Sequence, residues 1–163
     1  MIHLNLAKEA DLYSIAKMAQ EIWNAHYVDM IGQEQVNYML AKFYNHESLV
    51  EQLTKKNHRF YIIQDQNEAV GFLSVSSENG MDYFLHKFYI YTDKSNAGTG
   101  TKTLNVLLKL TKAKSLKLTV NRQNFKSINF YFKNGFKISS VEDFDIGNGY
   151  QMNDFVMLKR LDV

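Results

Sequence analysis

A loop of small residues, placed between an apolar segment and a helical pattern, is the sharpest chemical feature of the chain. Glycine allows neighbouring backbone N–H groups to converge on one anion, and the first turn of a helix adds the positive end of its dipole. The loop therefore predicts a phosphate or pyrophosphate site, with a plain strand-to-helix turn as the alternative. Its residues are Ser95, Asn96, Ala97, Gly98, Thr99, Gly100 and Thr101.

Two common phosphate motifs are excluded by the residues around these glycines. A dinucleotide fingerprint has a third glycine, where this chain has Thr103, and an acid about 20 residues further on. No Asp or Glu occurs between Asp93 and Glu142. A Walker A loop continues as Gly-Lys-Ser or Gly-Lys-Thr, whereas Gly100 is followed by Thr-Lys. The loop therefore fits neither of these two nucleotide-binding classes.

Charge is divided sharply along the chain. Residues 94–137 hold ten Lys or Arg and no acid, whereas residues 1–93 and 138–163 have net charges of −5 and −3. This division favours an anionic ligand for the middle segment and a cationic one for the flanks, although a solvated basic helix face explains it equally well. An RNA-binding module is a weaker alternative, because the chain has only three arginines. We expect no nucleic-acid partner.

Composition excludes several other classes. A chain of 163 residues with 45% hydrophobic residues suits one domain. The absence of cysteine excludes disulfides, thiolate metal sites and a cysteine nucleophile, and the five histidines show no ligand spacing, so we expect no metal. No signal peptide is visible and no apolar stretch approaches membrane-spanning length. We therefore expect a cytoplasmic protein with no membrane partner.

The elements that position the loop follow from hydrophobic periodicity. Alternation and apolar runs predict strands at residues 1–6, 59–64, 69–76, 81–91, 116–120, 136–141 and 151–158. Helical spacing predicts helices at residues 11–27, 33–44, 47–55, 98–112 and 125–134, the first with Asp11 as its N-cap. Helices lead and strands then alternate with helices, so we expect an α/β (α+β) sandwich around a mixed sheet.

A second block, residues 118–136, reads as a strand, Asn124, a helix that carries Tyr131, and a Gly-Phe pair. Together with the glycine loop, this block resembles the GNAT superfamily of acyl-CoA-dependent N-acetyltransferases. The segment 150–157 is similar to the last strand of bacterial members. One departure is that the family usually has Gln or Arg where this chain has Ser95.

The resemblance implies a fold and a reaction. Residues 1–163 would form one domain with a mixed, mostly antiparallel central sheet flanked by helices. The enzyme would move an acetyl group from acetyl-CoA to a primary amine of a small, polyamine-like molecule, by direct attack in a ternary complex. A non-catalytic acyl-CoA-binding protein is the alternative, because of Ser95. The sequence leaves open whether the chain forms a homodimer.

The same resemblance assigns catalytic roles. Tyr131 matches the family's helix tyrosine and would protonate the leaving thiolate, although a core aromatic would have the same spacing. The backbone amides of Phe88 and Ile90 would hold the pantetheine arm, with the Phe88 N–H as the oxyanion donor. Strand alternation places Phe84, His86 and Phe88 on one face, so His86 or a water would be the base; a hydrogen-bonded sheet histidine is the alternative.

The remaining assignments concern the two ligands. Asn124 would cap its helix and also contact the cofactor arm. Lys133, and equally Lys126, would meet the cofactor's 3′-phosphate, unless they are simply solvated.

Glu21, Trp23 and Tyr27 lie where the family builds its acceptor pocket. The run from Glu21 to Tyr27 is similar to the same region of bacterial polyamine acetyltransferases. Acids and aromatics together suit a cationic amine, although helix packing for Trp23 and surface charge for Glu21 are the simpler interpretations.

Overall fold

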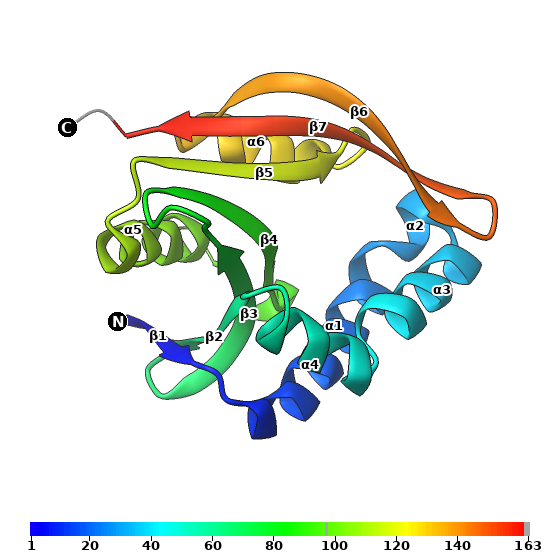
Figure 1. The fold of residues 1–163 in the computed structure, drawn as a ribbon, viewed down its shortest axis with the longest axis horizontal. Helices are drawn as coiled ribbons and strands as arrows, with labels where there is room; N and C mark the ends of the chain where they lie inside the picture. Colours follow the sequence, from blue (N-terminus) through cyan, green and yellow to red (C-terminus); the bar gives the residue numbers. More distant parts are fainter. Residues whose placement is uncertain (97, 162–163) are drawn as a thin grey trace.

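One sheet organises the chain (Figure 1). In the computed structural model, which describes residues 1–96 and 98–161, it has seven strands in the order β1-β2-β3-β4-β5-β7-β6. The β4–β5 pair is parallel and the other neighbouring pairs are antiparallel, which confirms the mixed, mostly antiparallel sheet. The strands are β1 (Ile2–Leu6), β2 (Arg59–Asp65), β3 (Glu68–Ser76), β4 (Asp82–Ile90), β5 (Ser115–Asn121), β6 (Lys137–Gly147) and β7 (Tyr150–Arg160).

Helices cover both faces of this sheet (Figure 1). The helices are α1 (Leu12–His26), α2 (Val28–Ile31), α3 (Gln33–Phe43), α4 (His46–Thr54), α5 (Thr99–Thr111) and α6 (Phe125–Lys133), with short 3-10 turns η1 (Glu9–Asp11) and η2 (Thr92–Lys94). In the part of the chain described, no helix is long and apolar enough to cross a membrane.

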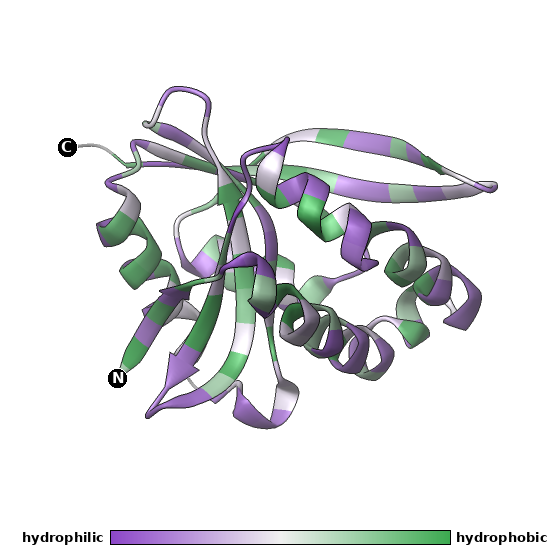
Figure 2. Ribbon diagram, turned by 60° about the horizontal axis from the view of Figure 1, so that its bottom comes forward, coloured by the Kyte–Doolittle hydropathy of each residue, from purple (hydrophilic) through white to green (hydrophobic). Residues whose placement is uncertain are grey.

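Two hydrophobic cores lie on the two sides of the sheet. One joins α5 and α6 to the sheet through fully buried side chains such as Leu104 and Leu118, and the other joins α1, α3 and α4 through Ile15, Leu49 and Phe72. Burying each such side chain is worth about 1.5–3 kcal/mol. Hydrophobic and hydrophilic bands alternate along the helices, as this three-layer arrangement requires (Figure 2).

The strands β4 and β5 separate part-way along their length. They pair from Asp82 to Leu85 on β4, against Ser115 to Leu118 on β5, and no further. Beyond Leu85 the edge of β4 that faces β5 has no strand beside it among the described residues. This separation opens the middle of the sheet, and both cavities described below lie along it.

A β-bulge lies at the start of this opening. Val75 of β3 pairs with Leu85 and Ser74 with Lys87, so His86 is an extra residue on β4. The prediction that His86 and Phe88 share a face was therefore wrong, because the bulge interrupts the alternation. Phe88 packs toward α6, against Phe130, whereas the His86 ring stacks on His58 at 3.7 Å between ring centroids.

Other differences from the predicted elements are local. The Asp11 side chain does not cap α1; it accepts a hydrogen bond from the Lys8 N–H and so closes the preceding 3-10 turn. The helix α2 was not predicted. Strand β6 continues to Gly147, six residues past its predicted end at Val141, because pairing with β7 holds an acidic segment that lacks apolar alternation.

Candidate active site

Two cavities meet along the opening between β4 and β5. The loop-side cavity, about 230 Å³, reaches Ser95 and Gly100 of the glycine loop and Lys126 at the start of α6. The hairpin-side cavity, about 90 Å³, reaches Asp154 on β7 of the β6–β7 hairpin. Six residues line both cavities: Tyr27, Phe88, Tyr89, Asn124, Ser127 and Tyr131. The two cavities are therefore adjacent at these residues.

Backbone donors of β4 point into this meeting place. The Tyr91 N–H donates to the Val70 oxygen of β3 at 2.9 Å, so it points away from β5. N–H directions alternate along a strand, so the N–H groups of Ile90 and Phe88 point toward the opening. Both residues line the loop-side cavity, and Phe88 lines the hairpin-side cavity as well. The N–H groups of Phe88 and Ile90 lie on the same open edge of β4, so they suit an extended ligand that carries amide groups.

The glycine loop turns the chain from η2 into α5. Gly98 is the N-cap residue of α5 and has a φ of +94°, which only glycine adopts without strain. A Cβ atom on Gly100 would lie 2.8 Å from the ring of Phe130, so a side chain there would force that ring to shift. The absence of a side chain at Gly100 thus lets the Phe130 ring of α6 pack against the start of α5, beside the loop-side cavity.

Other loop residues hold the turn rather than line a cavity. The Thr99 hydroxyl donates to the Asn96 side chain, and Thr99 is almost fully buried. Asn96, Thr99 and Thr101 line neither cavity. Ala97 lies outside the described residues. The loop therefore offers Ser95 and Gly100 directly to a ligand.

Tyr131 and Asn124 stand where the two cavities join. Asn124 caps α6, since its side chain accepts a hydrogen bond from the Ser127 N–H at 3.2 Å. Burial raises the pKa of the Tyr131 phenol above its ordinary value of 10, with the neighbouring Tyr27 as the lesser cause. Tyr131 is therefore protonated at neutral pH and, like Phe88, lines both cavities.

His86 is partly buried and lies near cationic side chains, which the sequence alone does not reveal. Its Nε2 is 2.6 Å from the Ser76 hydroxyl. Burial first, and then the nearby His58 and Lys87, lower the pKa of His86 to about 3. The imidazole is consequently neutral across the physiological range and is a weak proton acceptor. That His86 is the base stays a prediction.

Comparisons with known proteins were made once this geometry was established. A family model described as an acetyltransferase (GNAT) domain matches residues 27–156, which is most of the chain. The chain belongs to the GNAT acetyltransferase family. It is accordingly an acetyl-CoA-dependent N-acetyltransferase.

Individual relatives agree with this family. The chain is 25% identical, over 92% of its length and 91% of the relative, to a spermidine N(1)-acetyltransferase of Thermoplasma acidophilum. It is 29% identical to the peptidyl-lysine N-acetyltransferase YjaB of Salmonella typhimurium, over 68% of this chain and 72% of that one.

Solved structures share the fold. A PaiA N-acetyltransferase from Thermoplasma acidophilum in complex with coenzyme A superposes with a TM-score of 0.79 at 24% identity, over 99% of both chains. A GCN5-related N-acetyltransferase from Rhodopseudomonas palustris gives 0.79 at 19% identity, over 98% of this chain and 95% of that one.

Within this GNAT domain, the predicted acceptor residues separate. Trp23 and Tyr27 line the hairpin-side cavity, and their rings lie 4.7 Å apart. Glu21 lines neither cavity, and its exposed carboxylate accepts a hydrogen bond from the Tyr91 hydroxyl at 2.7 Å. Lys133, at the end of α6, also lines neither cavity, whereas Lys126 lines the loop-side one.

Asp154 is the residue that the sequence analysis missed. It is 1% exposed, its Oδ1 has no hydrogen-bond partner, and it lines the hairpin-side cavity. Burial raises the pKa of this carboxyl to about 6, against a Thr119 hydrogen bond and the Arg122 charge, which lower it. A signal was available: Met152, Asp154 and Val156 alternate on one face of β7, and an acid at such an inward position is unusual.

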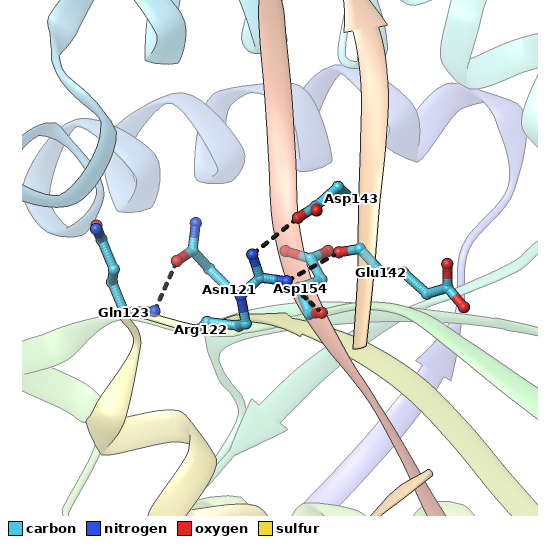
Figure 3. Close-up of polar contacts among 6 residues, drawn as sticks. All are labelled: Asn121, Arg122, Gln123, Glu142, Asp143 and Asp154. Atoms are coloured by element: carbon cyan, nitrogen blue, oxygen red, sulfur yellow. Dashed lines mark hydrogen bonds and ion pairs between the residues drawn. The ribbon is translucent and has the colours of Figure 1, made fainter. Parts of the chain in front are cut away.

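Arg122 stands beside Asp154 but does not neutralise its carboxylate. Its guanidinium donates to the Asp143 carboxylate at 2.8 Å and to the backbone oxygens of Glu142 and Asp154 at 3.3 and 3.4 Å (Figure 3). The arginine thus ties β5 to the β6–β7 hairpin. The Asp154 side chain is left facing the cavity.

Proposed function

We propose that this enzyme acetylates a primary amine on a small cationic molecule, by direct attack on acetyl-CoA within a ternary complex. One observation carries the proposal: two cavities of different chemistry meet at Phe88 and Tyr131. The loop-side cavity has backbone donors and a lysine, which suit an anionic, amide-bearing thioester. The hairpin-side cavity has aromatic walls and a carboxylate, which suit a cation.

Acetyl-CoA would lie along the loop-side cavity. Its pantetheine amides would pair with the free β4 edge at Ile90, and its pyrophosphate would meet the loop at Ser95 and Gly100. Lys126, rather than Lys133, is the better candidate for a cofactor phosphate, because Lys126 lines the cavity. This arrangement puts the thioester carbonyl at the Phe88 N–H.

The chemistry at the meeting point needs an oxyanion donor and an acid. The amine nitrogen attacks the carbonyl carbon, and the Phe88 N–H stabilises the charge on the carbonyl oxygen. The carbon–sulfur bond then breaks, and the Tyr131 hydroxyl protonates the departing thiolate. The lowered pKa of His86 argues against it as the group that deprotonates the amine.

The relatives support an amine acceptor without fixing its identity. The Thermoplasma acidophilum relative is named for spermidine, and YjaB for peptidyl-lysine. Both acceptors are cationic primary amines. The hairpin-side cavity, about 90 Å³, has room for the end of an aliphatic chain only.

An amine panel tests this proposal. Release of CoA from acetyl-CoA would be followed with spermidine, putrescine, a lysine-containing peptide, and aniline as an acceptor that is neutral at pH 7.5. We expect turnover with one or more of the aliphatic amines at a kcat/KM at least tenfold above that for aniline. Binding of acetyl-CoA with no transfer to any of these acceptors would instead indicate a non-catalytic acyl-CoA-binding protein.

A further inference from the structure

Asp154 is a buried carboxylate with an unused hydrogen-bond acceptor. It is 1% exposed, and its Oδ1 has no partner among the described residues. An unsatisfied buried carboxylate is costly, so its presence calls for an explanation. The Arg122 charge and a Thr119 hydrogen bond stabilise the carboxylate in part, but Arg122 does not pair with it, because its guanidinium donates to Asp143 and to backbone oxygens.

The position of Asp154 relates it to the reaction. It lines the hairpin-side cavity and is the only acid among the described residues that do so. It does not line the loop-side cavity. An amine between Asp154 and the Phe88 N–H would therefore have a carboxylate on one side and the thioester on the other.

The walls of this cavity favour a cation as well. Trp23, Tyr27, Tyr89 and Tyr131 surround it, and rings of Trp23 and Tyr89 lie 5.7 Å apart. Aromatic faces attract an ammonium, and an unpaired carboxylate attracts it more strongly in a desolvated site. The aromatic walls and Asp154 together form a receptacle for one ammonium group.

We propose that Asp154 binds the ammonium of the acceptor amine through Oδ1 and takes its proton before attack on acetyl-CoA. This inference rests on the proposed function and names its proton acceptor. An aliphatic amine is almost wholly protonated at neutral pH and has no free electron pair in that form. Transfer of one proton to Asp154 leaves a neutral carboxylic acid and a neutral amine beside the thioester.

The remaining steps balance without a further reactant. The amine electron pair forms the C–N bond, and the carbon–sulfur bond breaks with its pair on sulfur. The thiolate takes the Tyr131 proton. When the tetrahedral intermediate collapses, the new amide nitrogen still carries two hydrogens, and it gives one of them to the tyrosinate. Asp154 returns its proton to solvent when the products leave. The net products are the acetamide, CoA thiol and one proton.

The charges around Asp154 are suited to this task. Burial raises the pKa of the carboxyl to about 6, so it is ionised at pH 7 yet is a stronger base than an exposed aspartate. The titratable or charged groups near it are Arg122 on the β5 side, Tyr27 after α1, Tyr131 on α6, His86 on β4, and Glu142, its pairing partner on β6. The tyrosines and His86 carry no charge at pH 7, since the pKa of Tyr27 is about 12.

Asp154→Asn tests the inference, with Asp143→Asn as the matched control. Asp143 has the same side chain on the neighbouring strand, paired with Arg122 outside the cavity. With spermidine as the acceptor, Asp154→Asn should lower kcat/KM at least 100-fold. The wild-type kcat/KM should rise with pH near pH 6, and Asp154→Asn should remove this rise. Asp143→Asn should keep both the rate, within threefold, and the rise.

A weakly basic acceptor separates proton transfer from mere binding. Trifluoroethylamine is largely unprotonated at pH 7.5, so Asp154→Asn should slow its acetylation much less than that of n-butylamine. Equal slowing of the two amines would overturn the role of Asp154 as proton acceptor. The CoA thermal shift should stay as in the wild-type protein, because Asp154 does not line the loop-side cavity.

The two failures remain distinguishable. A wild-type protein that acetylates no amine would overturn the proposed function. A wild-type protein that is active, with an Asp154→Asn variant that keeps its kcat/KM and its pH profile, would overturn the role of Asp154 alone. His86→Ala tests the base that the sequence predicts. Loss of the rise near pH 6 in that variant, and not in Asp154→Asn, would assign the role of proton acceptor to His86.

Discussion

The two cavities differ in how they are assembled, although they share the opening between β4 and β5. The loop-side cavity combines Ser95 and Gly100 of the glycine loop, residues 88–90 of β4 and residues of α6 with residues of α1 and α2. The hairpin-side cavity takes four residues each from β4 and β5, and one or two from each of α1, α2, α3, α6 and β7. The glycine loop and Ile90 line only the first cavity, whereas Asp154 and Trp23 line only the second.

This difference corresponds to the two substrates: the cofactor is common to all acetyl-CoA-dependent reactions, whereas the acceptor amine differs between enzymes. A cofactor that is the same for every reaction can be held by backbone donors, which need a conformation more than a side chain. An acceptor must be distinguished by side chains, so its cavity depends on residue identity. Substitutions on the loop side should therefore abolish cofactor binding, whereas those on the hairpin side should alter the rate or the choice of amine.

The largest effect is expected at Gly100. A Cβ atom there would lie 2.8 Å from the Phe130 ring, so Gly100→Asp would displace that ring in the loop-side cavity and bring a negative charge to the proposed phosphate site. We expect the thermal shift produced by CoA to disappear. Gly149→Asp is the control for added charge and backbone strain, because that glycine is in the β6–β7 turn with open space around it and a φ of +79°. An unchanged shift in Gly100→Asp would mean that CoA binds elsewhere.

Tyr131→Phe should have the next largest effect. Loss of the phenol removes the acid, so kcat should fall roughly 10- to 1,000-fold while CoA affinity stays nearly the same. Tyr61→Phe, in the α5–α6 core and outside both cavities, controls for the loss of a buried hydroxyl. Steady-state kinetics at saturating acetyl-CoA measures both. Wild-type turnover in Tyr131→Phe would remove this residue from the mechanism.

At Asp154 we expect a gain in thermal stability together with the loss of activity. The folded-state pKa of about 6 exceeds the ordinary 3.8, so the folded protein binds more protons than the unfolded chain between these values. Stability from this group is therefore lost as the pH rises from about 4 to 6, by at most about 3 kcal/mol. Asp154→Asn should raise Tm at pH 7.5, by roughly 2–4 °C per kcal/mol, and change it little at pH 3.5.

This experiment compares the variant with the wild-type protein at each pH, because the buried histidines act in the opposite direction. The pKa of His58 falls to about 4 and that of His86 to about 3, both below the ordinary 6.5. Their contribution is present above pH 6.5 and is lost as the pH falls toward these values. A lower Tm of Asp154→Asn at pH 7.5 would mean that the carboxylate stabilises the fold, contrary to a functional cost.

The smallest effect is expected at Glu21. The carboxylate accepts a hydrogen bond from the Tyr91 hydroxyl outside both cavities, and the amide of Glu21→Gln can accept the same bond. The KM for spermidine should change less than threefold. A tenfold rise would extend the acceptor site to Glu21 and would blur the contrast between the cavities.

The sequence predicted the turn of the glycine loop and the cap of α6 for a physical reason. Gly98 and Gly100 are near each other in the chain, and the φ of +94° at Gly98 and the close approach at Gly100 leave a direct trace in residue type. Asn124 and Tyr131 are likewise set by one short helix. The sheet type followed from the family resemblance, and the order of its strands was not predicted.

The hairpin side was harder because its residues meet only through tertiary structure. Asp154 and Trp23 are far apart in the chain, and no local pattern joins them. The bulge at His86 changes which residues of β4 share a face, and alternation alone does not reveal an inserted residue. Charge counting assigned a cation to the acidic flanks and named Glu21, whereas the cavity contains Asp154 instead.

The most direct test of the account is the structure of the enzyme with a bisubstrate analogue, in which spermidine is joined through an acetyl linker to the sulfur of CoA. The account predicts that the linker carbonyl oxygen lies within hydrogen-bond distance of the Phe88 N–H. It also predicts that the linked nitrogen lies beside Tyr131, on the side of Asp154. A carbonyl that contacts no β4 donor, or a polyamine chain that leaves away from Asp154, would contradict it.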